Sequence, residues 1–89
     1  MKLPITKSGR KYGYIIWNLK NSMEMEKMLH GMDSVPIIFN GFVLGQKSID
    51  RRYHRISLGY KLTRALPLDQ TTFILNIENG ALEVTTSND

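Results

Sequence analysis

The sequence has no cysteine, which excludes disulfide bonds and thiolate metal sites together. Its 89 residues must therefore be stabilised by apolar packing, either within the chain or against a partner. A unit of about 40 residues seldom folds alone without such cross-links. We therefore expect a single domain over residues 1–89.

Long hydrophobic runs are also missing. No stretch approaches the roughly 20 apolar residues that a membrane-spanning helix needs, and residues 1–10 lack the apolar region of a secretion signal. These absences predict a cytoplasmic protein with no membrane partner.

Catalytic and metal-binding patterns are sparse, because the chain has only two histidines to serve as bases. His30 falls at the end of a predicted helix, where an imidazole interacts favourably with the helix terminus. His54 lies among arginines, so contact with phosphates or bases suits it better than catalysis. No His, Asp and Glu residues have the spacing of a metal site. We expect no enzymatic activity, no metal and no cofactor.

Charge is distributed in alternating segments. Residues 1–20 carry five cations and no acid, and residues 47–64 carry six cations and one acid. Residues 21–46 and 65–89 are both net acidic. This pattern is typical of a side that faces a polyanion, although an unevenly charged surface without function gives the same composition.

Two Asn-Gly pairs, Asn40-Gly41 and Asn79-Gly80, predict β-hairpins, because both residues suit the positive-φ positions of a type I′ turn. A two-residue loop fixes the register of the second hairpin and pairs Glu78 with Ala81 and Leu75 with Val84. Its apolar residues then share one face, so this hairpin should be half buried.

The first hairpin is apolar on both faces. The same reasoning pairs Phe39 with Phe42 and Ile37 with Leu44. Such a hairpin should be covered on both sides, by the core and by a second element or a partner. Pro36 cannot donate to a neighbouring strand, so this strand begins there or lies at an edge.

Each hairpin follows a predicted helix and a basic strand. The first helix has Asn21 as its N-cap and Gly31 at its end, with apolar residues at Met25, Met28, Leu29 and Met32. The second helix covers residues 60–66 and stops at Pro67. The strand-like segments are residues 11–17 and 52–58.

The order of these elements predicts an α+β, mainly β fold with two halves, residues 1–46 and 47–86, and a frayed tail at residues 87–89. The alternative is two unrelated hairpins in one α+β domain. The basic cluster at residues 51–55 has two interpretations, a charged sheet edge that prevents aggregation or an element that contacts phosphates. The second basic block in the first half favours phosphate contact.

The run from Tyr53 to Asp69, YHRISLGYKLTRALPLD, resembles the AbrB and MazE type of swapped-hairpin DNA-binding domain. Arg55 takes the place of the arginine in the family's Gly-Arg pair, residues 62–66 that of its short helix and residues 73–84 that of its hairpin. In the first half Gly9-Arg10 and Asn40-Gly41 match more faintly. The resemblance implies a β-barrel made from two β-α-β-β halves, arranged in tandem as in MraZ-type proteins to form an internal pseudo-dimer.

The resemblance also implies a transcriptional regulator that contacts double-stranded DNA, either as this pseudo-dimer or as a homodimer. The expected DNA-binding residues are Arg10, Lys11, Lys47, Arg51, Arg52, His54, Arg55, Lys61 and Arg64. An alternative function is a protein-interaction module, such as an antitoxin or a phage or host inhibitor, that uses the hairpin at residues 35–44 and the Met-rich helix. A third is RNA or single-strand binding through Tyr53, Tyr60 and Trp17.

Overall fold

The computed structural model describes all 89 residues. Its elements, in chain order, are β1 (Lys2–Pro4), α1 (Lys7–Tyr12), β2 (Tyr14–Ile16), α2 (Leu19–Leu29), β3 (Ser34–Phe39), β4 (Phe42–Asp50), β5 (Arg55–Ser57), α3 (Tyr60–Arg64), β6 (Thr72–Glu78) and β7 (Ala81–Ser87).

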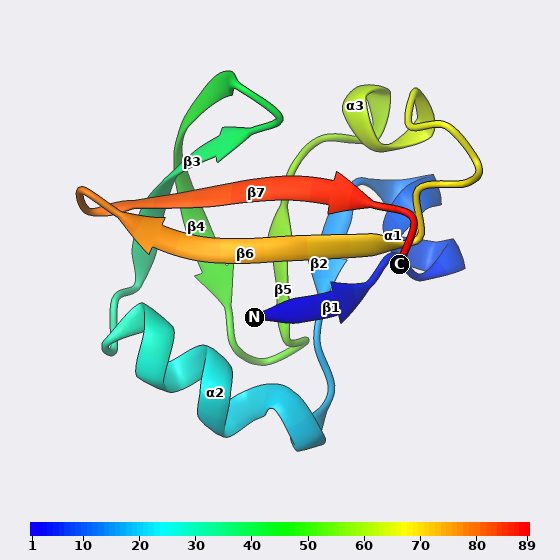
Figure 1. Cartoon of the computed structure of the whole chain (residues 1–89). Helices are drawn as coiled ribbons and strands as arrows, with labels where there is room; N and C mark the ends of the chain where they lie inside the picture. Colours follow the sequence, from blue (N-terminus) through cyan, green and yellow to red (C-terminus); the bar gives the residue numbers. More distant parts are fainter.

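The strands form one nearly closed, barrel-like sheet in the order β1-β6-β7-β3-β4-β5-β2. Every neighbouring pair is antiparallel except β3 and β7, which run parallel. Helix α2 lies along one end of the sheet, while α1 and α3 lie together at one side (Figure 1). The fold is α+β and mainly β, as predicted.

The sheet and α2 enclose a single apolar core. Phe39 and Phe73 meet edge to face with their ring centroids 6.2 Å apart. The core contains Leu3, Ile15, Trp17, Met25, Leu29, Val35, Ile37, Phe39, Ile49, Ile56, Leu58, Phe73, Leu75, Leu82 and Val84.

The second hairpin has the predicted register, with Glu78 opposite Ala81 and Leu75 opposite Val84. Asn79 and Gly80 adopt φ values of 53° and 78°, as a type I′ turn requires. The alternate residues are buried, so the prediction of a half-buried hairpin is confirmed.

The first hairpin departs from its predicted register after two residue pairs. Phe39 lies opposite Phe42 as predicted, but Ile37 lies opposite Gly45 and not Leu44. A bulge causes the shift, because one extra residue of β4 enters the ladder between Ile37 and Ile38. The prediction that both faces are covered is also wrong within this chain, because Val43, opposite Ile38, remains 78% exposed.

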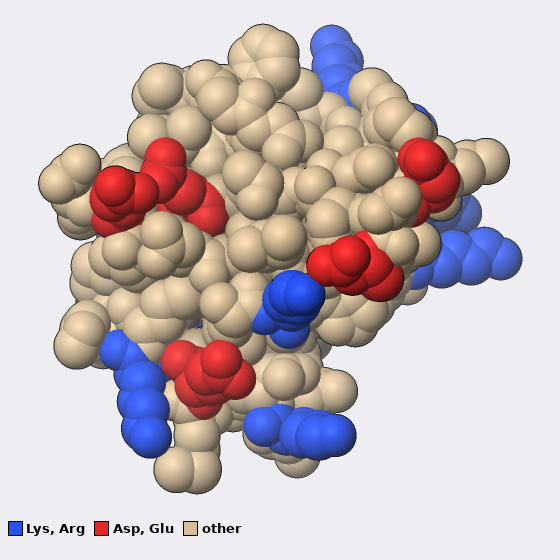
Figure 2. All heavy atoms as spheres, in the orientation of Figure 1, with Lys and Arg blue, Asp and Glu red and all other residues tan.

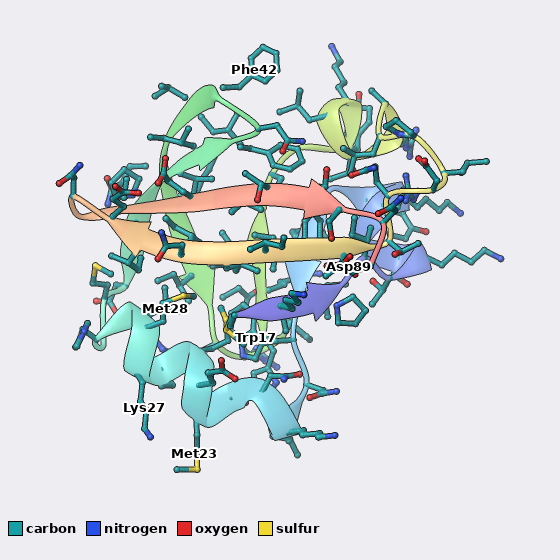
Figure 3. The ribbon with its side chains drawn as sticks, viewed as in Figure 1. Trp17, Met23, Lys27, Met28, Phe42 and Asp89 are labelled. Atoms are coloured by element: carbon teal, nitrogen blue, oxygen red, sulfur yellow. The ribbon has the colours of Figure 1, made fainter.

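Helix α2 begins before the predicted N-cap. The side chain of Asn18, not Asn21, caps it by accepting a hydrogen bond from the backbone N–H of Asn21 at 3.1 Å. Met25 is buried and Met28 packs against the core, whereas Met23 and Lys27 point away from the sheet (Figure 3). None of the helices has both the length and the apolar character required to cross a membrane.

A helix occupies part of the first predicted basic strand. Residues 7–12 form α1, because Thr6 caps the N-terminus through Gly9 N–H and Gly13 ends the helix with a φ of 86°. The strand that remains, β2, pairs with β5, so the two basic segments adjoin. The second predicted helix is confirmed at Tyr60–Arg64.

The chain continues in one strand across the predicted boundary between the halves, and its last residue is hydrogen-bonded to the rest of the fold. The boundary between residues 46 and 47 falls inside β4, which continues to Asp50. At the tail, the backbone carbonyl of Asp89 accepts hydrogen bonds from Thr71 and Thr72, and its carboxylate lies 3.0 Å from Lys2 Nζ. The last residues therefore lie against β1 and the start of β6.

Two carboxylates interact on the outer face of the second hairpin. A hydrogen bond with Glu78 and repulsion from its charge raise the pKa of Glu83 above its usual 4.5. A raised folded-state pKa gives stability that is fully present below the unfolded-state value and is lost as pH rises through the folded-state value. We predict that Glu83→Gln removes this loss, so that its thermal midpoint falls less than that of wild type as pH rises above 4.5. Two identical pH profiles would contradict the interaction.

Candidate nucleic-acid interface

Each of the four tyrosines lies beside an arginine or lysine. These cation–π pairs come from α1, β2, the turn before β5, β5 itself and α3. We call the surface they form the basic tyrosine face. Its pairs, with the distance from the cation to the ring centroid, are Tyr14 with Arg55 (4.3 Å), Tyr60 with Arg64 (4.8 Å), Tyr53 with Arg55 (5.0 Å), Tyr12 with Lys11 (5.2 Å) and Tyr53 with Arg52 (5.4 Å).

The pairing of β2 with β5 builds the centre of this face. Ile15 lies opposite Ile56, and both side chains are fully buried. Because side chains alternate along a strand, the neighbouring residues Tyr14 and Arg55 must point outward. They sit diagonally across the two strands, which brings the guanidinium over the ring.

Hydrogen bonds to backbone carbonyls join the end of α1 to α3 and to the residues just before it. The Gly13 carbonyl accepts hydrogen bonds from the backbone N–H groups of Leu58 at 2.6 Å and Gly59 at 3.1 Å. Arg64 Nε donates to the Lys11 carbonyl at 2.7 Å, and Thr63 Oγ1 donates to the Arg10 carbonyl at 2.7 Å. Residues from the two basic segments of the sequence are therefore fixed next to one another.

Arg55 is held by one carboxylate and two aromatic rings. Its Nε lies 3.2 Å from Asp50 Oδ2, and its guanidinium lies over both Tyr14 and Tyr53. The second oxygen of Asp50 accepts from Tyr53 N–H, which fixes the turn before β5. The Nη1 and Nη2 groups have no protein partner, so a pre-oriented fork of donors is available to a carboxylate, a phosphate or a guanine edge.

A cavity of about 400 Å³ opens beside Arg55. It is lined by Ser8 and Tyr12 of α1, Tyr14 and Ile16 of β2, and Arg55. Hydroxyl and guanidinium groups on an otherwise apolar lining suit a polar group attached to a flat or apolar body.

The charge around this face is one-sided. Residues 51–68 contain no acid, and neither do residues 1–20. On the molecular side that carries β6 and β7, acidic and basic side chains are scattered over a mostly uncharged surface (Figure 2). The face with β2, β5, α1 and α3 is therefore the one suited to an anion.

The structure brings together some of the predicted binding residues and separates others. Lys11, Arg52, Arg55 and Arg64 belong to the basic tyrosine face, and Lys61 is exposed on α3 beside it. Lys47 is half-buried on β4, opposite Val35.

Three predicted binding residues are engaged inside the chain. Arg10 donates to the carbonyls of residues 66, 67 and 70, so it holds the end of α3. Arg51 lies between two carboxylates that offset its charge, with Nε 2.9 Å from Glu26 Oε1 and Nη1 3.7 Å from Asp33 Oδ1. His54 stacks on Trp17 with 5.9 Å between the ring centroids.

The sequence interpretation missed Tyr12 and Tyr14. Their signal was the alternation of cations and aromatics in Arg10-Lys11-Tyr12-Gly13-Tyr14, which parallels the cluster at residues 51–55. Trp17, considered for base stacking, is instead buried in the core.

No cluster of three His, Asp, Glu or Cys side chains is arranged to hold a metal ion. The chain matches no family model, no curated protein and no solved structure.

Proposed function

We propose that this protein is a DNA-binding transcriptional regulator that contacts duplex DNA through the basic tyrosine face. The observation that carries the proposal is the meeting of two basic segments, about 40 residues apart in sequence, at the β2–β5 pair, where Asp50 is hydrogen-bonded to Arg55. Cations with aromatic neighbours gathered on one face are typical of nucleic-acid interfaces.

Each group has a distinct role in this proposal. The free Nη1 and Nη2 atoms of Arg55 form a planar fork that can bind guanine O6 and N7, or two phosphate oxygens, with little loss of side-chain entropy. Lys11, Arg52 and Arg64 contact flanking phosphates and fix the register on the duplex.

We further propose that the barrel is of the AbrB swapped-hairpin type. Two features support this. β3 of the first half pairs with β7 of the second, so the two hairpins adjoin. His54, where the family has glycine, adopts a φ of 51°, in the left-handed region that favours glycine.

The alternative function, a protein-interaction module, was expected to use the Met-rich helix and the first hairpin, and only the hairpin is exposed. Met25 is fully buried and Met28 packs on the core, so the Met-rich helix is largely structural. The exposed first hairpin remains available to a partner. Trp17 is buried and cannot stack on a base, which removes one of the three aromatic residues expected for RNA or single-strand binding.

The proposal is tested by selecting duplexes from a random library at physiological salt and measuring affinity against salt concentration. We expect the logarithm of affinity to fall linearly with that of salt, because bound phosphates release counterions. Arg52→Ala should lower the slope by about 1, whereas Arg55→Ala should weaken binding with a smaller change in slope, because Asp50 already offsets the Arg55 charge. Lys27→Ala on α2, which points away from the sheet, is the matched control and should leave the slope unchanged (Figure 3).

Arg51→Ala should change the slope less than Arg52→Ala, because two carboxylates already offset the Arg51 charge. Failure to recover any duplex, or equal slopes for wild type and Arg52→Ala, would contradict the proposed face.

A further inference from the structure

The cavity beside Arg55 is lined by polar groups that have no partner within the chain. Ser8, Tyr12 and Tyr14 each contribute a hydroxyl group, and Ile16 contributes an apolar side chain. None of the three hydroxyl groups takes part in a hydrogen bond of the fold, and Asp50 engages only the Nε of Arg55. These groups are therefore free to bind a molecule that enters the cavity.

Arg55 is the group in this cavity that selects an anion. Its guanidinium lies 4.3 Å from the ring centroid of Tyr14 and 5.0 Å from that of Tyr53, and its Nε lies 3.2 Å from Asp50 Oδ2. Because these contacts hold the guanidinium plane, Nη1 and Nη2 form a fixed fork that matches two oxygens of one phosphate or carboxylate group.

The charge around the cavity favours a phosphate monoester over a carboxylate. Asp50 offsets part of the Arg55 charge. On α1, however, Lys7 precedes Ser8 and Lys11 precedes Tyr12, and both lysines are exposed and form no ion pair. A phosphate monoester carries close to two negative charges at neutral pH, so it gains more from these cations than a singly charged carboxylate does.

The remainder of the lining suits a flat ring. Tyr12 is 56% exposed, so its ring can stack on a group at the mouth of the cavity, and Ile16 is half-buried beside it. Every nucleobase has a flat face that stacks on an aromatic side chain. The volume of about 400 Å³ lies within the range of small-molecule sites.

We propose that this cavity binds a nucleoside monophosphate, with the phosphate on the Arg55 fork and the Ser8 hydroxyl and the base against Tyr12 and Ile16. This binding needs no DNA. Its regulatory consequence rests on the proposed function, in which the same Arg55 fork contacts duplex DNA. Since one fork cannot hold both ligands, the nucleotide and the duplex should each lower the affinity for the other by the same factor.

Calorimetric titration of the full chain with adenosine 5′-monophosphate (AMP) tests the site in the absence of DNA. AMP should bind at least about tenfold more tightly than adenosine, inorganic phosphate or benzoate, because only AMP supplies both the phosphate and the base. Arg55→Lys, which keeps the charge but loses the fork, should weaken AMP binding about tenfold.

Ser8→Leu gives a second reading, because it replaces the hydroxyl with an alkyl group at an exposed position of α1 and leaves the Asp50–Arg55 pair in place. It should also weaken AMP binding about tenfold. Thr85→Leu makes a similar exchange at an exposed position of β7, which does not line the cavity, and is the matched control with wild-type affinity.

AMP that binds no more tightly than inorganic phosphate overturns the proposal, and so does tighter binding of benzoate. Folded Arg55→Lys and Ser8→Leu chains, checked by circular dichroism, that bind AMP like wild type overturn the location of the site.

Displacement of a labelled, selected duplex by AMP tests the regulatory consequence. AMP should release the duplex from wild type, and Ser8→Leu should need about tenfold more AMP for the same release. AMP that binds the chain but leaves the duplex bound overturns the competition. A chain that binds AMP as expected but selects no duplex overturns the proposed function alone, so the two failures are distinguishable.

Discussion

Gly13→Ala is expected to lower the free energy of unfolding by about 3 kcal/mol, since the substitution combines left-handed strain with a backbone clash. Gly13 has a φ of 86°, and a Cβ there would lie 2.3 Å from Tyr60 N and 2.4 Å from the carbonyl carbon of Gly59. These are backbone atoms, so no rotamer change relieves the contact. Urea denaturation followed by circular dichroism measures the loss.

Gly31→Ala separates the two causes. Gly31 also has a positive φ, of 71°, but a Cβ there would meet nothing within 4 Å. This variant should lose only about 1 kcal/mol, from the conformational strain alone. Equal losses for the two variants would show that α1 and α3 do not approach each other at Gly13 as described.

Arg10→Lys is expected to cost about 2 kcal/mol, although it keeps the charge, because hydrogen bonds from a charged donor are the ones lost. The guanidinium donates to the carbonyl oxygens of Leu66 at 2.9 Å, Pro67 at 3.4 Å and Gln70 at 2.6 Å. A lysine ammonium cannot span these acceptors with the geometry of a planar fork. The thermal midpoint and the urea midpoint should both fall.

Lys11→Ala provides the comparison on the same helix. Its ammonium has no hydrogen-bond partner in the chain, so the variant should change stability by less than about 0.5 kcal/mol. The effects on DNA binding should be the opposite of the effects on stability. Lys11→Ala should lower the slope of affinity against salt, and Arg10→Lys should leave that slope unchanged. If Arg10→Lys is as stable as wild type, the structural role of Arg10 is contradicted, and Arg10 is again a candidate DNA contact.

Local chemistry explains which parts of the fold could be predicted. The Asn-Gly turns fix both hairpins within a few residues of the chain, so the register from Glu78 to Leu75 follows from the sequence. The bulge beside Ile37 was missed, although Gly45, which lies opposite Ile37 with a φ of 80°, is the kind of isolated strand glycine that marks a bulge. Asn18 and Asn21 are both good caps, and only the path of the chain out of β2 selects Asn18.

The candidate site was harder to predict because it depends on contacts between distant segments. Composition indicated two basic segments, but not that β2 and β5 pair and bring Tyr14 under Arg55. Charge alone also could not separate Arg10 and Arg51, which hold the fold together, from Arg52 and Arg55, which face outward. That separation requires the positions of the carbonyl and carboxylate groups that accept from each guanidinium.

The most direct test of the basic tyrosine face is an NMR titration of the ¹⁵N-labelled chain with its selected duplex. The account predicts that the largest amide shift changes fall in β2, in residues 51–57 and where α1 meets α3, and that they weaken as salt is raised. Amides in α2 and on the β6–β7 side should change little. Changes concentrated in α2 or in the β6–β7 hairpin, with β2 and β5 unaffected, would contradict the assignment of this face to DNA.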